Sequence, residues 1–362
     1  MLATVRTVAD LPTDIHDTIA TFLPDKDLIQ FVCASRQIVV SPYLLRQRQR
    51  AYWKKCGVVN LARKGDLAGL QYLHGLGFKM TIKLCNIRDI YAMNEAAYYG
   101  HLAVVQYLHS IGAPYTKKVM DWAAENGHLA VVQFLHSIGV PCKEHMMKDM
   151  MDLAAQNGHL AVVEFLHSIG APYTTEAMDD AAGEGHLAVV EFLHSIGAPY
   201  TTEAMDWAAA DGHLAVIEFL HSIGAPYTTK AMSYAAINGH LAVVQFLHSI
   251  GAPCTDNEMD NAMDLAAENG HLTVVQFLHS IGAPYTTNAM NHASDNGHLA
   301  VVQFLHSIGA PCTARAMDLA ASHGHLAMVE FLHSIGAPHT NKAMDWAARS
   351  GHLAVVDFLR SI

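Results

Sequence analysis

Residues 186–212 read HLAVVEFLHSIGAPYTTEAMDWAAADG, and residues 213–239 read HLAVIEFLHSIGAPYTTKAMSYAAING. Both stretches are 27 residues long and nearly identical. The histidine that opens them recurs at 101, 128, 159, 186, 213, 240, 271, 298, 325 and 352, at intervals of 27 residues except for two intervals of 31. A fixed period of this length predicts an elongated array of equal units rather than a single compact core.

Each unit carries the pattern of two helices. Between Leu187 and Ile196 the apolar side chains fall mainly on one stripe at helical spacing, which indicates an amphipathic helix. Gly197 supplies a left-handed C-terminal cap, and Pro199 cannot continue the helix. The two threonines that follow can cap a second helix, which ends at Gly212. We therefore expect an all-α solenoid of short and longer antiparallel helices, because no pair can bury its apolar stripe alone.

The units resemble ankyrin repeats. The pattern A-A-x-x-G-H-L-x-V-V-x-F-L-x-x-x-G-A carries the resemblance and matches in register across nearly every unit. Ankyrin units usually have about 33 residues, and the residues missing here lie where that family forms a projecting β-hairpin. The resemblance implies helix pairs that are joined by a tight A-P-Y-T-T turn, and it implies a protein-binding function.

The array is expected to occupy residues 56–362. Residues 57–77 fit a degenerate first unit, and residues 342–362 are expected to be a C-terminal cap, in which Asp357 and Arg360 introduce charge. Each 31-residue interval has four extra residues, about one helical turn. They lie before the short helix, which contains the Met-Asp step. These two places are expected to have a longer helix or loop.

Residues 1–55 share nothing with the repeat and form a separate helical module in our interpretation. They carry eight Lys or Arg against five Asp or Glu, which leaves 14 against 28 for the rest of the chain. Their apolar spacing predicts three short helices, of which the last is the basic segment 44–55. The alternative is that these helices only cap the array.

The arrangement L-P-x-x-I-x-x-x-I-x-x-F-L-x-x-x-D-L-x-x-F-V-C-x-S-R in residues 11–36 resembles the F-box. The F-box is a small helical motif that docks on the Skp-type adaptor of cullin ubiquitin ligases. A segment of this size leaves apolar side chains uncovered, so a partner would complete its core. The residues to which the resemblance assigns docking are Leu11, Pro12, Ile15, Ile19, Leu23, Leu28, Val32 and Cys33.

Target recognition is expected at positions that vary while the rest of the unit is constant. The variation concentrates after the Met-Asp step and just before the Gly-His pair. In ankyrin proteins the matching positions face the concave side and touch the partner. The residues expected on this face are Tyr98, Tyr99, Trp122, Glu125, Asp180, Glu184, Trp207, Asp211, Tyr234, Asp295 and Trp346. Aromatic and acidic side chains suit a basic protein surface; the alternative is that these aromatics only pack between units.

The many histidines do not predict a metal site. The two histidines of one unit, such as His186 and His194, are more than two helical turns apart, so one ion cannot bridge them. Ladders of histidines between units would lack third and fourth ligands. We expect the opening histidine to bond the turn and the second to fill a groove between units, with pH sensing as the other hypothesis. Asp121, Asp179 and Asp206 recur too regularly for a unique catalytic centre.

The sequence therefore predicts a protein that catalyses nothing and binds no metal or cofactor. Its acidic repeats disfavour nucleic acid, and no apolar run is long enough for a bilayer, so we expect no membrane contact. The expected location is the cytoplasm, with the nucleus as an addition, or the host cytoplasm if the chain is viral. The leading hypothesis is a substrate-recruiting ubiquitin ligase adaptor, monomeric outside its complex. The alternatives are a scaffold or masking protein without a ligase link and, third, an enzyme.

Overall fold

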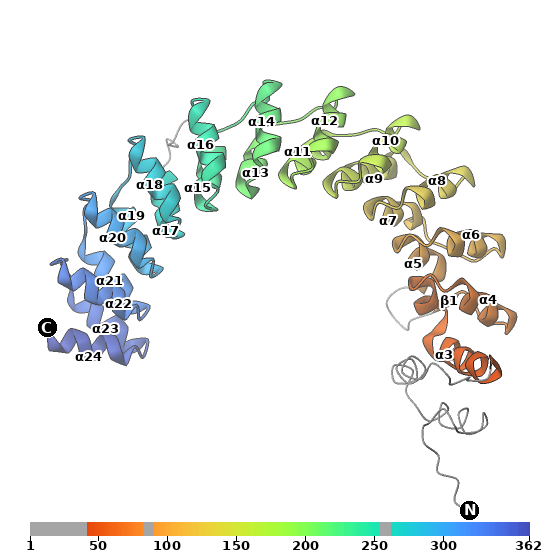
Figure 1. The fold of residues 1–362 in the computed structure, drawn as a ribbon, viewed down its shortest axis with the longest axis horizontal. Helices are drawn as coiled ribbons and strands as arrows, with labels where there is room; N and C mark the ends of the chain where they lie inside the picture. Colours follow the sequence, from red (N-terminus) through yellow and green to blue (C-terminus); the bar gives the residue numbers. More distant parts are fainter. Residues whose placement is uncertain (1–41, 83–89, 253–261) are drawn as a thin grey trace, which may run out of the picture. The chain divides into compact units, whose positions relative to one another are not determined.

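The computed structural model describes residues 42–82, 90–252 and 262–362. Within these ranges the chain is helical apart from one short pair of strands (Figure 1). The all-α expectation is thus confirmed for the bulk of the described residues. The chain divides into two compact units, Met1–Pro141 and Cys142–Ile362. The expected adaptor-docking residues between Leu11 and Cys33 lie outside the described residues.

The first unit contains six described helices and two strands. They are α3 (Pro42–Arg63), α4 (Leu67–Gly75), β1 (Thr81–Ile82), β2 (Ile90–Tyr91), α5 (Ala92–Tyr98), α6 (Leu102–Ser110), α7 (Val119–Glu125) and α8 (Leu129–Ser137). Gly57, with φ 75° and ψ 164°, interrupts α3 close to the expected end of the N-terminal module. The part of α3 before Gly57 is the basic helix that the sequence predicts.

A hydrogen bond joins this first part of α3 to the degenerate repeat. The indole N–H of Trp53 donates to Oδ2 of Asp66 at 2.7 Å, and the Trp53 ring lies 5.3 Å from the ring of Tyr72 on α4. Asp66 stands where later units have their opening histidine, and it also caps α4 by accepting from the backbone N–H of Gly69. The basic helix therefore packs on α4 as part of the same helical layer.

The strands β1 and β2 were not expected from the sequence. They pair antiparallel, with Thr81 opposite Tyr91 and Ile82 opposite Ile90. They lie in the long interval between the degenerate unit and the first complete one, where the extra residues allow the backbone to double back. Elsewhere in the described ranges the turns between helix pairs contain no strand, as the shortened repeat predicts.

The second unit is a stack of eight helix pairs. Their helices are α9 (Glu144–Gln156), α10 (Leu160–Ser168), α11 (Thr175–Gly183), α12 (Leu187–Ser195), α13 (Glu203–Asp211), α14 (Leu214–Ser222), α15 (Lys230–Ile237), α16 (Leu241–Ser249), α17 (Ala262–Glu268), α18 (Leu272–Ser280), α19 (Thr287–Asp295), α20 (Leu299–Ser307), α21 (Ala314–Ser322), α22 (Leu326–Ser334), α23 (Asn341–Arg349) and α24 (Leu353–Ser361). Each odd-numbered helix contacts the next odd-numbered one, and the even-numbered helices contact one another (Figure 1). The odd-numbered helices of this unit are called the odd-helix layer below.

The expectation of a short helix followed by a longer one is wrong for most pairs. In α11/α12 and α13/α14, for example, all four helices have nine residues. The cause is that the first helix of each pair starts directly after the threonine turn and continues to the residues before the Gly-His pair. The first 31-residue interval lengthens α9 to 13 residues, as expected, whereas the second interval falls in 253–261, outside the described residues.

Both helices of a pair contribute to one continuous core. Val189, Val190 and Leu193 of α12 are at most 1% exposed, and Met205 and Ala208 of α13 are fully buried. The same positions are buried in the other pairs of the unit, except for Met344 of α23, which is half-buried. Since every pair hides its apolar stripe against its neighbours, stability depends on the stacking between pairs.

Candidate functional site

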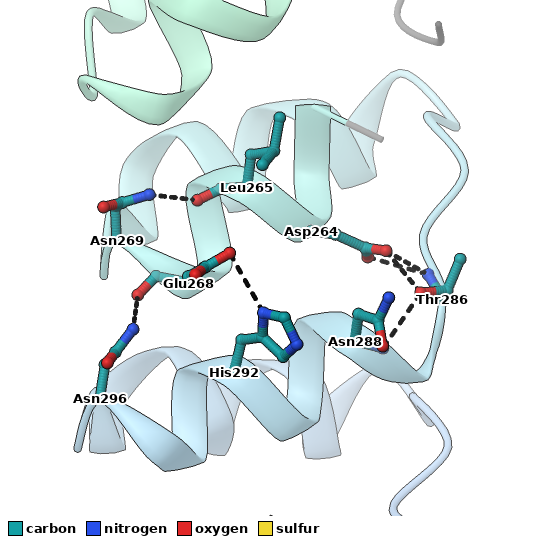
Figure 2. Close-up of polar contacts among 8 residues, drawn as sticks. All are labelled: Asp264, Leu265, Glu268, Asn269, Thr286, Asn288, His292 and Asn296. Carbon is teal, nitrogen blue, oxygen red and sulfur yellow. Dashed lines mark hydrogen bonds and ion pairs between the residues drawn. The ribbon is translucent and has the colours of Figure 1, made fainter. Parts of the chain in front are cut away.

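The constant aspartate of the odd-helix layer holds the next helix pair in place. In α17 the carboxylate of Asp264 accepts hydrogen bonds from the backbone N–H of Thr286 at 2.9 Å and from its hydroxyl at 2.5 Å (Figure 2). The same hydroxyl oxygen accepts from the backbone N–H of Asn288 at 3.0 Å and so caps α19. One carboxylate therefore fixes both the turn and the start of the following helix.

This contact repeats with a spacing of 22 residues. The pairs are Asp152–Thr174, Asp179–Thr201, Asp206–Thr228, Asp264–Thr286 and Asp318–Thr340, with Asn291–Thr313 and, in the first unit, Asn94–Thr116 as amide versions. Burial raises the pKa of Asp152 and Asp179, and the threonine hydrogen bonds oppose that shift. The recurrent aspartates thus have a structural role, as their regularity in the sequence suggests.

The opening histidine also binds the preceding pair. The Nε2–H of His271 donates to the carbonyl oxygen of Ile237 at 2.8 Å, and that of His325 donates to Asp295 O at 2.9 Å. A carbonyl oxygen can only accept, so this bond places a proton on Nε2. The prediction of a hydrogen bond to a turn is confirmed at these positions, with the correction that the turn belongs to the previous pair.

The second histidine of each unit packs on a phenylalanine of the next unit. The ring of His194, for instance, meets the ring of Phe219 edge-on at a centroid separation of 5.7 Å. Equivalent contacts of 5.8 to 6.0 Å occur at His167, His221, His248, His279, His306 and His333. In the described residues no three His, Cys, Asp or Glu side chains come together as metal ligands.

In α9, α11, α13, α17 and α21 the residue that follows the buried aspartate is more exposed than the aspartate itself. Asp206, for example, is 3% exposed and bonded to Thr228, whereas Trp207 beside it is 38% exposed. In the first unit Tyr98 and Tyr99 are 39% and 46% exposed. Of the positions that the sequence assigns to recognition, the exposed ones are therefore Tyr98, Tyr99, Glu184, Trp207 and Asp211, and the others are half-buried.

Some predicted contact residues also pack between neighbouring pairs. In the first unit the Tyr98 ring meets the Trp122 ring edge-on at 6.3 Å, and Glu125 is half-buried. In the second unit Asp295 lies 2.7 Å from Nδ1 of His323, and Lys342 lies over the ring of Trp346 at 5.6 Å. The alternative that these aromatics pack between or within units thus describes part of the set.

Two internal contacts at variable positions were not expected from the sequence. Glu268 of α17 pairs with Nδ1 of His292 on α19 at 3.1 Å, and the side-chain amide of Asn296 donates to the carbonyl oxygen of Glu268 at 2.8 Å (Figure 2). Their signal in the sequence is a histidine that follows Met-Asn in one unit and a glutamate before Asn-Gly in the unit before it. These residues tie α17 to α19 and leave less free surface there.

The remaining predicted contact residues of the second unit gather on α11, α13 and α15. Glu184, Trp207 and Asp211 are exposed, and Asp180 and Tyr234 are half-buried. Within the described part of the chain none of the carboxylates among them forms an ion pair. In this part of the odd-helix layer, the described carboxylates therefore do not hold neighbouring helices together through ion pairs.

The enzyme alternative would require a pocket with convergent polar groups. A cavity of about 270 Å³ lies at the last helix pair, lined in part by His339, Asp345 and Leu359. Asp345 occupies the register of the threonine-binding aspartates, so this cavity has the chemistry of a surface between helix pairs. Cys312 is half-buried, and burial raises the pKa of its thiol, which disfavours the nucleophilic thiolate. No helix within the described ranges is long and apolar enough to cross a bilayer.

Stacked antiparallel helix pairs joined by the same contacts define a helical repeat protein. A family model described as ankyrin repeats (3 copies) matches residues 205–289 and 232–316. The matched part of the chain, residues 205–316, therefore consists of ankyrin repeats, as the sequence resemblance implies. A comparison with curated proteins gives no match.

Proposed function

We propose that this protein is a non-enzymatic adaptor that binds a target protein on the exposed face of its odd-numbered helices. Ankyrin repeats form an interaction scaffold, and repeats of this kind are present in the chain. The observation that carries the proposal is that constant and variable residues along the odd-numbered helices have different surroundings. Constant residues such as Asp179 and Asp206 are buried and bonded to the next pair, whereas the variable Asp180 and Trp207 face outward.

The exposed residues have the chemistry of a protein-binding surface. Aromatic side chains at the centre of a patch contribute most of the affinity in many interfaces, and Trp207 is such a side chain. Carboxylates around it favour a positively charged partner and disfavour phosphate backbones. The target-contact set of the proposal comprises Tyr98, Tyr99, Trp122, Glu125, Asp180, Glu184, Trp207, Asp211, Tyr234, Asp295 and Trp346. The protein needs no partner copy for this role and acts as a monomer outside its complex.

In this proposal, the N-terminal module determines which complex the adaptor joins. The resemblance to the F-box supports docking of residues 1–55 on the Skp-type adaptor of a cullin ubiquitin ligase in the cytoplasm, through Leu11, Pro12, Ile15, Ile19, Leu23, Leu28, Val32 and Cys33. The other subunits of the ligase would then transfer ubiquitin to the target. One observation favours the second candidate, a scaffold without a ligase link: the bond from Trp53 to Asp66 makes the helix after residue 41 part of the packed array.

Affinity purification of two reciprocal variants tests both halves of the proposal. Ile15→Asp combined with Leu28→Asp should lose the Skp-type adaptor and retain the target, because charges replace two docking side chains. A surface variant that combines Asp180→Asn, Glu184→Gln, Trp207→Leu and Asp211→Asn should lose the target and retain the adaptor. Quantitative mass spectrometry of the captured proteins is the measurement.

A matched control removes charge from the other layer. Glu191 and Glu218 lie exposed on α12 and α14, and Glu191→Gln with Glu218→Gln should retain both partners. Absence of the Skp-type adaptor from the wild-type capture would refute the ligase link in favour of the scaffold. Retention of the target by the surface variant would refute the assigned binding face.

A further inference from the structure

Four residues at α11 and α13, of which Asp180 is half-buried and the other three are exposed, form an acidic and aromatic surface. Asp180 and Glu184 are one turn apart at the C-terminal end of α11, and Trp207 and Asp211 occupy the same two registers at α13. Residues four apart on a helix are neighbours on its surface, and α11 and α13 are in direct contact. The four side chains thus make two adjacent columns, called the α11–α13 surface below.

Gly183 brings the tryptophan close to α11. A Cβ on Gly183 would lie 3.2 Å from Cβ of Trp207 and 3.6 Å from its ring atom Cε3. The other units have larger side chains at the position of Gly183, for example Glu268 and Arg349. The absence of a side chain at Gly183 therefore permits the close approach of Trp207 to α11. Among the tryptophans that the structure describes, only Trp207 is exposed.

The helices that carry the α11–α13 surface contribute only negative charge, and the nearest lysine along the chain, Lys230, begins the neighbouring helix α15. The helices α11 and α13 contain no Lys or Arg, and Glu176 and Glu203 add to the carboxylates of the surface. In the described chain no ion pair involves any of these carboxylates. Burial raises the pKa of Asp180, and the negative charges of Glu176, Asp152, Asp179 and Glu184 raise it further. A cation placed here would relieve this repulsion.

The same register in another unit shows what a tryptophan there holds. In α23 the ammonium group of Lys342 lies 5.6 Å from the ring centroid of Trp346, the geometry of a cation–π contact. Lys342 precedes Trp346 by one turn, and the residue in that register at Trp207 is Glu203. Trp346 therefore has a lysine of its own helix over its ring, whereas the matching residue for Trp207 is a glutamate.

We infer that the α11–α13 surface binds an arginine side chain in a basic segment of the partner protein. The guanidinium group stacks on Trp207, and Asp180, Glu184 and Asp211 accept its hydrogen bonds. Arginine fits better than lysine because its planar group can stack on an aromatic ring and bond a carboxylate with two parallel N–H groups. This inference rests on the proposed target-binding function and specifies the chemistry of the target.

Peptide binding measured by fluorescence anisotropy tests the inference on the full chain. The probe is a labelled peptide with four arginines separated by Gly-Ser, compared with the same peptide carrying lysines or glutamates. The arginine peptide should bind about threefold more tightly than the lysine peptide, and the glutamate peptide should not bind. Trp207→Leu should weaken the arginine peptide about tenfold. Circular dichroism confirms that each variant is folded.

Further variants distinguish a defined site from general attraction to an acidic chain. Asp180→Asn with Asp211→Asn should weaken binding about tenfold, whereas Glu191→Gln with Glu218→Gln removes equal charge and should have little effect. Glu203→Lys should weaken binding more than Glu203→Gln, since it provides Trp207 with a cation from its own helix.

The outcomes distinguish this inference from the proposed function. Equal binding of arginine and lysine peptides, or arginine binding that survives Trp207→Leu, would overturn the inference. If the surface variant loses its target in the purification while the arginine peptide does not bind the wild type, the inference fails and the target-binding function remains. If the surface variant retains its target as well, both fail.

Discussion

Gly185→Ala should destabilise the repeat stack by about 4 kcal/mol, through backbone strain and overpacking together. Gly185 has φ 80°, a conformation that costs an L-residue about 1 to 2 kcal/mol. In addition, a Cβ at this position would lie 2.5 Å from Nδ1 of His213, which belongs to the next helix pair. The imidazole cannot move away without loosening the contact between pairs. Urea unfolding followed by far-UV circular dichroism measures the effect.

Gly197 provides the matched control for this substitution. It has a similar φ of 75°, but nothing lies within 4 Å of the Cβ that alanine would add. Gly197→Ala should therefore cost only the backbone term, about 1 to 2 kcal/mol. His213→Ala in the Gly185→Ala background should recover part of the loss as a favourable coupling of about 1 to 3 kcal/mol. Equal losses for the two glycine variants would contradict the assigned role of the histidine ring.

Asp179→Ala should lower the free energy of unfolding by about 2 kcal/mol, because it removes the acceptor for two groups of Thr201. The backbone N–H of Thr201 donates to Asp179 at 2.9 Å and its hydroxyl donates at 2.8 Å. Asp179→Asn should remain within about 0.5 kcal/mol of the wild type. The chain already contains this amide version, since Asn94 accepts from the Thr116 N–H at 3.0 Å and donates to its hydroxyl at 2.6 Å.

The difference in free energy of unfolding between the wild type and Asp179→Asn should depend on pH in a defined direction. Burial raises the pKa of Asp179 above the ordinary aspartate value of 3.8, so the folded protein holds this proton more tightly than the unfolded chain. The stability that this bound proton contributes is therefore complete below 3.8 and is lost as pH rises through the raised pKa. The stability of the wild type relative to Asp179→Asn should fall from acidic to neutral pH. Urea unfolding of both proteins across that range measures it, and a difference that grows with pH would contradict the assignment.

The sequence predicts those features that depend on short-range chemistry repeated in every unit. Glycine before each histidine and proline after each second glycine define where the helices end. The helical spacing of apolar residues identifies Val190 and Leu193 as part of the core. The relative helix lengths were wrong because the start of α13 depends on the hydroxyl of Thr201, which accepts from the Glu203 N–H at 3.1 Å. A single-sequence pattern does not distinguish that capping role from a longer turn.

Contacts between units were less accessible from the sequence. The bond from Asp179 to Thr201 and the packing of His194 on Phe219 join residues more than 20 positions apart, and only the spatial register of the helices reveals them. The candidate surface was predicted by its variation among units, which separated Trp207 from Asp206. Variation among the units did not show that the ring of Trp346 is covered by Lys342, whereas Trp207 is exposed to solvent.

The central claim is that the odd-helix layer, and not the even-numbered helices, contacts the target. Photo-crosslinking tests it directly, with benzoylphenylalanine placed at Glu203 of α13 or at Glu191 of α12, two exposed glutamates on opposite layers. Both replacements remove one negative charge, so they differ only in their location. Mass spectrometry should find the target crosslinked at position 203 and absent at position 191. A target crosslinked mainly at 191 would contradict the account.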